Sequence, residues 1–121
     1  MTLLKFVLHV SMILFFSATS VFAEQLTMDY LAGPWCYSHT LSGNDRQDEM
    51  KSLLFDKNGS FSYQQSKYNK KLTPGFKYEI LPDKLKLKPL FPGVLKVKSV
   101  KQDEMILHYF IELYFIRGEC P

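Results

Sequence analysis

Two cysteines lie at opposite ends of this chain, and no other cysteine lies between them. Cys36 belongs to the run LAGPWCYSHT (31–40), and Cys120 ends the run YFIRGEC (114–120). A disulfide between them requires Cα atoms within about 7 Å of each other, which would place the first and last segments of the fold side by side. Closing a loop of this length stabilises a folded chain by about 4 to 5 kcal/mol in the chain-entropy account.

The N-terminal 23 residues have the three parts of a secretory signal peptide. Lys5 supplies the early positive charge, residues 6–16 are almost wholly apolar, and SATSVFA places Val21 and Ala23 at the −3 and −1 positions of a cleavage site. The apolar run is shorter than the roughly 18 to 20 residues that a membrane span needs. The sequence therefore predicts an exported protein, periplasmic or secreted, with no membrane span and a mature chain of residues 24–121.

Export favours a bond between Cys36 and Cys120, because disulfides form and persist in oxidising compartments. Two alternatives remain open at this point. The cysteines could be free thiols, or Cys36 and His39 could bind a metal, although two such ligands lack the further partners of a closed zinc site.

Residues 24–121 are long enough for one domain, near the lower limit for a core that needs no other support. The sequence has no internal repeat, low-complexity tract or linker, so we predict a single β domain over 24–121. Lys and Arg number 15 against 12 Asp and Glu, and the net charge of +3 falls further when Lys5 leaves with the signal peptide. So weak a bias argues against nucleic acid as a partner.

Short runs of alternating apolar and polar residues predict an all-β fold. The segment TMDYLAGP (27–34) predicts a short helical turn, with Thr27 as its cap and Gly33 as its stop. After Trp35 no stretch keeps a helical period, so we expect a small up-and-down antiparallel meander or barrel of seven or eight strands. The expected strands lie near 35–40, 50–55, 60–65, 76–80, 84–88, 94–99, 105–110 and 113–117.

The connections between these strands follow from turn chemistry. Asn58 and Gly59 in FDKNGSF predict a hairpin, because both residues tolerate positive φ. HYFIELYF (108–115) contains no glycine, proline or asparagine, so 105–117 could be a hairpin or one long strand. Longer connections are expected at one end of the meander, near 41–49, 66–75 and 89–93.

Alternation places one set of side chains inside the predicted barrel. In FKYEI, Phe76, Tyr78 and Ile80 share one side, and the lysine and glutamate between them share the other. The inward side chains are mostly large, so we expect a largely filled interior. The set comprises Trp35, Tyr37, Leu53, Phe55, Phe61, Tyr63, Phe76, Tyr78, Ile80, Leu85, Leu87, Leu95, Val97, Leu107, Leu113 and Phe115.

The start of the first strand resembles the lipocalin-like, or calycin-like, β-barrels. Their signature is Gly-x-Trp after a short helical turn, here Gly33-Pro34-Trp35 after TMDYL, and Arg117 matches their late arginine. The resemblance implies that Arg117 packs across Trp35 to close one end of a barrel, and that the barrel binds a small ligand. Independently, a guanidinium over an indole face gains about 0.5 to 2 kcal/mol. The alternative is that Arg117 is a solvated strand end.

No catalytic arrangement stands out in residues 24–121, so we expect no enzymatic activity, no cofactor and no bound metal. Neither His39 nor His108 has a predictable partner, and the sequence lacks G-x-S-x-G, H-E-x-x-H and phosphate-binding glycine motifs.

Lysines on consecutive strands predict a basic band on the outer wall. Such a band would attract an anionic membrane, glycan or protein; the alternative is a soluble wall that discourages edge pairing. The band comprises Lys77, Lys84, Lys86, Lys88, Lys96 and Lys98.

The segment MILHYFIELYFI is apolar on both alternating faces. Its outward side chains must be covered by the predicted helical turn, or else they form an exposed patch for a partner. They are Ile106, Phe110, Tyr114 and Ile116, and the turn would cover them with Met28, Tyr30 and Leu31.

These features predict an exported binding module that holds a small apolar ligand or a lipid tail at the rim of longer connections. The alternative is a protein-interaction module, such as an inhibitor of an extracellular hydrolase, which would use the same connections or the last hairpin.

Overall fold

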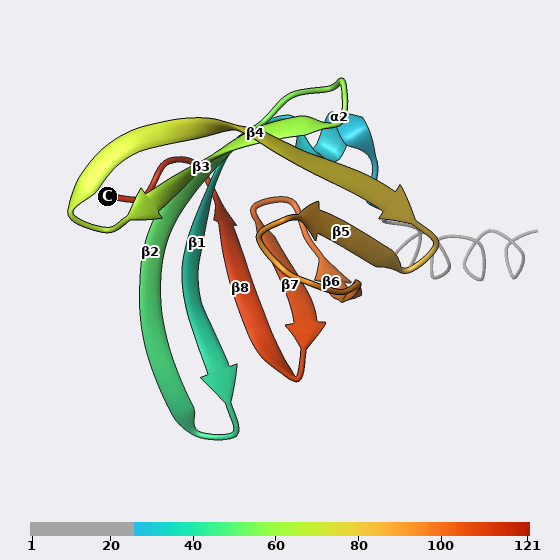
Figure 1. The fold of residues 1–121 in the computed structure, drawn as a ribbon. Coiled ribbons are helices and arrows are strands. Elements are labelled where there is room, and N and C mark those ends of the chain that lie inside the picture. Colours follow the sequence, from blue (N-terminus) through green and yellow to red (C-terminus); the bar gives the residue numbers. More distant parts are fainter. Residues whose placement is uncertain (1–25) are drawn as a thin grey trace, which may run out of the picture.

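The computed structural model describes residues 26–121, which form one helical turn and a closed barrel of eight antiparallel strands (Figure 1). Each strand pairs with the next along the chain, and β8 pairs with β1. The predicted all-β barrel is confirmed, with eight strands rather than seven. The predicted signal peptide, residues 1–23, lies outside the described residues. The elements are α2 (Met28–Leu31), β1 (Gly33–Ser42), β2 (Asp45–Phe55), β3 (Ser60–Ser66), β4 (Asn69–Leu81), β5 (Lys84–Lys88), β6 (Leu95–Val100), β7 (Glu104–Tyr109) and β8 (Ile111–Arg117).

The first and last strands lie side by side, as the cysteine positions predicted. Trp35 of β1 pairs with Arg117 of β8, and Cys36 pairs with Ile116. This ladder closes the barrel.

The segment 105–117 is a hairpin and not one long strand. Tyr109 pairs with Ile111, so Phe110 alone makes the turn, with φ of 64°. A bulky residue such as phenylalanine rarely adopts positive φ. Because this residue makes the turn in place of glycine or asparagine, the sequence carries no ordinary turn signal here.

Connections alternate between the two ends of the barrel. The end that carries α2, called the helix end here, also has the connections at 56–59, 82–83 and 101–103. The opposite end, called the hairpin end, has the connections at 43–44, 67–68 and 89–94 and the turn at Phe110.

Two of the three predicted longer connections are wrong. Residues near 41–49 and 66–75 continue the strands of the β1–β2 and β3–β4 hairpins, which turn tightly at 43–44 and 67–68. Consecutive side chains are exposed in these extensions, so the alternation of a half-buried strand is missing there. Only the connection at 89–94 remains long.

The inward side chains fill the barrel, as expected from their size. All sixteen predicted inward residues belong to the core cluster or pack against it, with Ile80 and Val97 half-buried at its edge. The core also contains Leu31 and Met105, which the alternation did not place inside. Trp35, Phe55, Phe61 and Phe115 are among its fully buried side chains.

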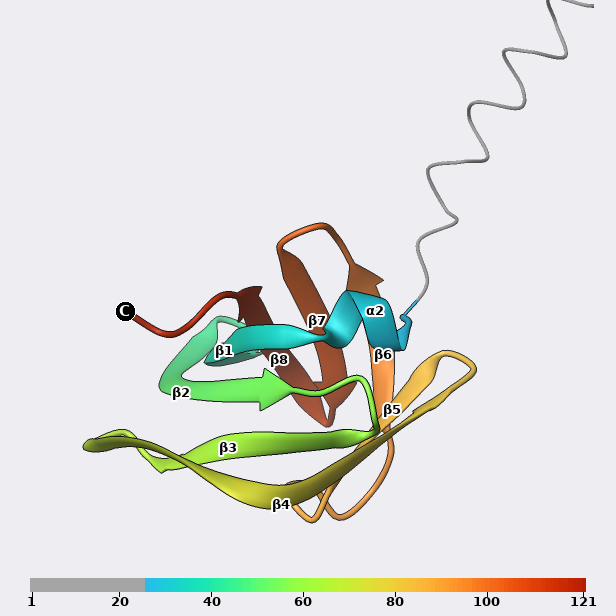
Figure 2. The ribbon, with the colours of Figure 1, turned by 90° about the horizontal axis from the view of Figure 1, so that it is seen from above.

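The helical turn α2 closes the helix end. Thr27 caps it by accepting a hydrogen bond from the Tyr30 N–H at Oγ1, and Leu31 is fully buried in the core. Figure 2 shows α2 against the β6–β7 connection, where the Tyr30 hydroxyl donates to main-chain carbonyls. Gly33 then starts β1 with φ of 108°, a conformation that suits glycine. The turn therefore does not cover Phe110, which stays 88% exposed.

Two pairs of adjacent strands, β2–β3 and β5–β6, are joined by only a few paired residues. At the β2–β3 seam the pairing runs only from Leu53–Tyr63 to Phe55–Phe61. At the β5–β6 seam it consists of Lys84–Lys96 and the adjacent leucine pair. Figure 1 shows the consequence at the first seam, where the β1–β2 and β3–β4 hairpins point in different directions.

Candidate functional site

Arg117 and Trp35 meet at the helix end. The Arg117 Cζ lies 4.3 Å from the centre of the Trp35 ring and 4.9 Å from that of Tyr30. Arg117 also donates from Nη2 to the Tyr30 carbonyl at 2.9 Å and from Nε to the Gln102 carbonyl at 3.1 Å. Trp35 Nε1 donates to the Leu31 carbonyl at 2.9 Å. Arg117 is therefore held by stacking and by hydrogen bonds to two other segments, and it is not a solvated strand end.

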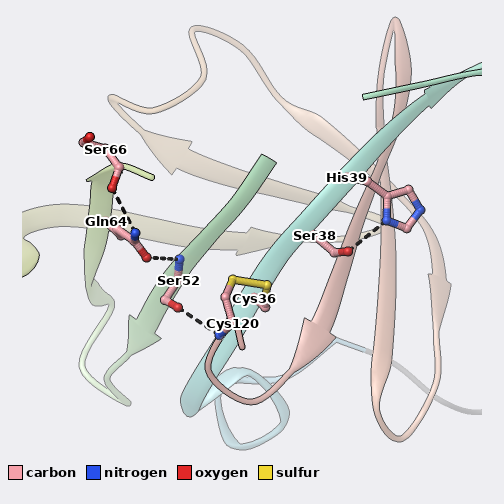
Figure 3. Close-up of a disulfide and its surroundings, with 7 residues drawn as sticks. All are labelled: Cys36, Ser38, His39, Ser52, Gln64, Ser66 and Cys120. Carbon is pink, nitrogen blue, oxygen red and sulfur yellow. Dashed lines mark hydrogen bonds between the residues drawn. A yellow bond between two sulfur atoms is a disulfide. The ribbon is translucent and has the colours of Figure 1, made fainter. Parts of the chain in front are cut away.

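Cys36 and Cys120 form a disulfide whose Cα atoms are 4.8 Å apart. The tail after β8 reaches Cys36 and continues to β2, where the Cys120 N–H donates to Ser52 Oγ at 3.0 Å (Figure 3). Both sulfur atoms are engaged, which excludes a metal site on Cys36 and two free thiols.

Gln64 supports the β2–β3 seam where the backbone ladder stops. Its buried Oε1 accepts from the Ser52 N–H at 3.0 Å, and its Nε2 donates to the Ser66 carbonyl at 2.9 Å (Figure 3). The side chain thus replaces ladder hydrogen bonds that the diverging strands cannot form.

A pocket lies at the β5–β6 seam, at the helix end. The Val97 N–H donates a hydrogen bond to the Asp83 carbonyl in the β4–β5 turn. Beyond this bond, residues 98–100 of β6 have no strand partner on the β5 side. The gap between this part of β6 and the β4–β5 turn is a pocket of about 610 Å³. It is lined by Leu26, Ile80, Leu81, Pro82, Asp83, Val97, Lys98, Ser99 and Val100.

The lining divides the pocket into an apolar floor and a polar mouth. Ile80 and Val97 are half-buried and pack against the barrel core, and Leu26 packs there from the N-terminal side. Asp83 is exposed, and the Lys98 ammonium forms an ion pair with Glu112 of β8. Polar atoms contribute more of the lining than apolar atoms do, so the pocket can contact both an apolar and a polar part of a ligand.

Tyr37 and Tyr63 are two of the three buried tyrosines that the structure describes in the barrel core, with Tyr78. Burial raises the pKa of Tyr63 to about 12 and that of Tyr37 above its usual range, and the nearby Glu49 carboxylate raises both further. Both hydroxyls are therefore held neutral, and they supply no base near pH 7.

We expect alkaline pH to destabilise the protein through Tyr63. Its folded pKa of about 12 exceeds the ordinary value of about 10, so the unfolded state loses its proton first. The free energy of unfolding should therefore fall as the pH rises from about 10 to 12. Urea denaturation across that range should show a smaller fall for Tyr63→Phe, and an unchanged fall for Tyr68→Phe, because Tyr68 is 89% exposed. Equal pH dependence in all three proteins would contradict this assignment.

The two histidines among residues 26–121 lie on the outer surface of the barrel, apart from the pocket. His39 stacks on Tyr114 with ring centres 4.4 Å apart, and burial lowers its pKa below the usual value. Exposed His108 lies opposite Lys96 and Glu112 on the neighbouring strands. Among residues 26–121 no group of three His, Cys, Asp or Glu side chains is placed to hold a metal.

The predicted basic band lies on the outer wall of β4, β5 and β6. Lys77 of β4 is directly opposite Lys88 of β5. Lys84 of β5 is directly opposite Lys96 of β6. Lys86 and Lys98 complete the band, which runs from the helix end to the hairpin end.

A crystal structure of a lipocalin-like protein from Bacteroides uniformis is similar to this chain, with a TM-score of 0.58 at 19% sequence identity. The match covers 74% of this chain and 99% of that protein. The fold is lipocalin-like. No protein-family model matches the sequence, and no curated protein matches it. In the part of this lipocalin-like barrel that the structure describes, no helix has the length and hydrophobicity of a membrane-spanning segment.

The pocket is not where the sequence placed the binding rim. The expected rim was at the hairpin end, whereas the pocket of this lipocalin-like barrel is at the helix end, beside a two-residue turn. Ile80 and Val97 were identified as inward-facing, but the sequence did not indicate that a pocket separates them. The sequence carried no signal for the pocket, because the strands predicted there, near 76–80, 84–88 and 94–99, have similar lengths.

Proposed function

We propose that the protein is an exported, non-enzymatic binding module that holds a small apolar ligand or a lipid tail in the pocket at the β5–β6 seam. The pocket carries this proposal. Its volume of about 610 Å³ falls within the range of small-molecule sites, and its floor is formed by Leu26, Ile80 and Val97.

The filled barrel axis supports this location of the site. Trp35, Phe55, Phe61 and Phe115 are fully buried in the interior, so a ligand cannot lie along the axis as it would in a hollow barrel. The seam is open instead, because the β5 ladder ends at Lys84 while β6 continues to Val100. A ligand there would cover apolar side chains that the wall leaves half-exposed.

Export is the second part of the proposal. The signal-peptide pattern of residues 1–23 supports it, and so does the disulfide, because such bonds are rare in reducing compartments. Periplasmic or secreted fractions should contain the processed chain beginning at Glu24, which mass spectrometry can identify.

Titration with dodecanoate, read by native mass spectrometry, tests the pocket. Val100→Lys should weaken binding by at least about tenfold, because it places an ammonium group against the apolar floor. Val94→Lys is the matched control, since Val94 is 42% exposed on the 89–94 connection and does not line the pocket. Urea denaturation should first show that both variants fold. Equal affinity of the two variants, or no dodecanoate adduct on the original protein, would contradict a pocket for apolar ligands.

A further inference from the structure

Two pairs of lysines in the basic band lie directly opposite each other on neighbouring strands, with Glu79 and Lys86 between the two pairs. Residues directly opposite on neighbouring antiparallel strands have close side chains, and like charges there destabilise the sheet. The pairs Lys77–Lys88 and Lys84–Lys96 both have this arrangement. The wall thus retains an unfavourable charge pattern at two places.

The acids within reach neutralise only part of this band. Glu79 lies 3.8 Å from the Lys86 ammonium and 3.9 Å from that of Lys88. Glu112 pairs with Lys98. In residues 26–121, the exposed lysines at 77, 84 and 96 form no salt bridge. Their charge is therefore available to an external anion.

An exposed aromatic tip adjoins the band at the hairpin end. Phe110 is 88% exposed and holds a backbone conformation, with φ of 64°, that glycine or asparagine would adopt at lower cost. Its ring lies 5.0 Å from that of Tyr109, which lies 5.7 Å from Phe91. Phe91 belongs to the 89–94 connection that directly follows Lys88, so the tip lies at the same end of the barrel as the end of the band.

The composition of this surface fits a lipid headgroup layer better than a protein. All six cations of the band are lysines, and lysine is depleted in protein interfaces where arginine is enriched. Lysine acts as a hydrated point charge, which suits the diffuse field of an anionic leaflet. An exposed phenylalanine next to lysines matches the way surface-bound proteins insert apolar side chains at the level of the headgroups.

We propose that the outer wall of β4–β6 and the Phe110 tip form a docking surface for an anionic lipid bilayer. The lysines supply attraction to acidic headgroups, and Phe110 enters the boundary between headgroups and acyl chains. This surface shares Lys98 with the pocket at the β5–β6 seam, but the apolar floor of the pocket belongs to Leu26, Ile80 and Val97 at the helix end.

Vesicle sedimentation tests the lysines, with residues 24–121 as the protein, since the described residues 26–121 close the barrel themselves. We expect binding to phosphatidylcholine vesicles that contain phosphatidylglycerol, weaker binding at high salt, and little binding to phosphatidylcholine alone. A triple change of Lys77, Lys84 and Lys96 to glutamine should weaken binding on the order of 100-fold, because each lysine near an anionic surface contributes about fivefold. The matched control changes three exposed lysines outside the band, Lys57, Lys67 and Lys101, to glutamine and should keep most of the binding.

A second pair of variants tests the aromatic tip. Phe110→Gly should fold without strain at φ of 64°, and it should weaken vesicle binding even at high salt. Tyr68→Gly, which removes an equally exposed aromatic ring from the 67–68 turn, should have little effect. Equal loss from both lysine triples, no loss from Phe110→Gly, or binding of heparin without binding of vesicles would overturn the proposal.

Discussion

Replacing Trp35 with alanine is expected to lower the free energy of unfolding by about 3 to 5 kcal/mol, the range for truncation of a fully buried tryptophan. Trp35 is 0% exposed, and its ring contacts the Arg117 guanidinium and the Tyr30 ring. Alanine would leave a cavity beneath Arg117 and would free the Leu31 carbonyl, which accepts from Trp35 Nε1. Urea denaturation followed by circular dichroism measures the change.

Tyr68→Ala provides the matched control for this measurement. It also removes an aromatic ring, but Tyr68 is 89% exposed, so the expected change stays within about 0.5 kcal/mol. Truncating a fully buried tryptophan lowers the free energy of unfolding by more than about 1 kcal/mol. A smaller loss for Trp35→Ala would therefore show that the ring does not close the helix end.

Removing the disulfide should lower the free energy of unfolding by a similar amount, for a different reason. The bond joins residues separated by 84 positions, and in the chain-entropy account the unfolded chain gains about 4 to 5 kcal/mol of freedom when it is lost. The double variant Cys36→Ala, Cys120→Ala should therefore approach the limit of stability for so small a domain. The folded structure should change little, because β1 and β8 remain paired by backbone hydrogen bonds.

Reductant breaks the disulfide but keeps both cysteine side chains. It therefore distinguishes the effect of the bond on stability from the effect of packing the two sulfur atoms. The original protein in reductant should unfold at nearly the same urea concentration as the double variant, and reductant should not affect the double variant. Ser52→Ala serves as a control, since it removes only the hydrogen bond from the Cys120 N–H and should cost about 1 kcal/mol. A double variant as stable as the original protein would contradict the expected role of the bond.

The sequence predicts this fold well wherever one face of a strand is buried. Phe76, Tyr78 and Ile80 alternate with charged residues because β4 separates the core from solvent there, and the structure places them inward. The paired cysteines and the Gly33-Pro34-Trp35 run predicted closure between the chain's first and last strands, which the structure shows. The alternation is a local signal that follows from burial, whereas the cysteine pair links positions that are 84 residues apart.

The sequence fails where strands extend beyond the core. Asp45, Arg46, Gln47 and Asp48 of β2 are all exposed, so a strand held only by its hairpin partner resembles a polar loop in sequence. The pocket could not be predicted for a related reason. It arises from the mismatch between the ends of β5 and β6, and that register depends on the closure of the whole barrel.

The two short seams divide the barrel wall into unequal segments. Strands β3, β4 and β5 form one three-stranded unit, and the other five strands form a second unit that contains the disulfide and the Arg117 contact with Trp35. Long ladders hold each unit together, whereas few backbone hydrogen bonds join the two units. Slow opening of the native state should therefore begin by separating the three-stranded unit at these two seams, and it should leave the covalently linked unit intact.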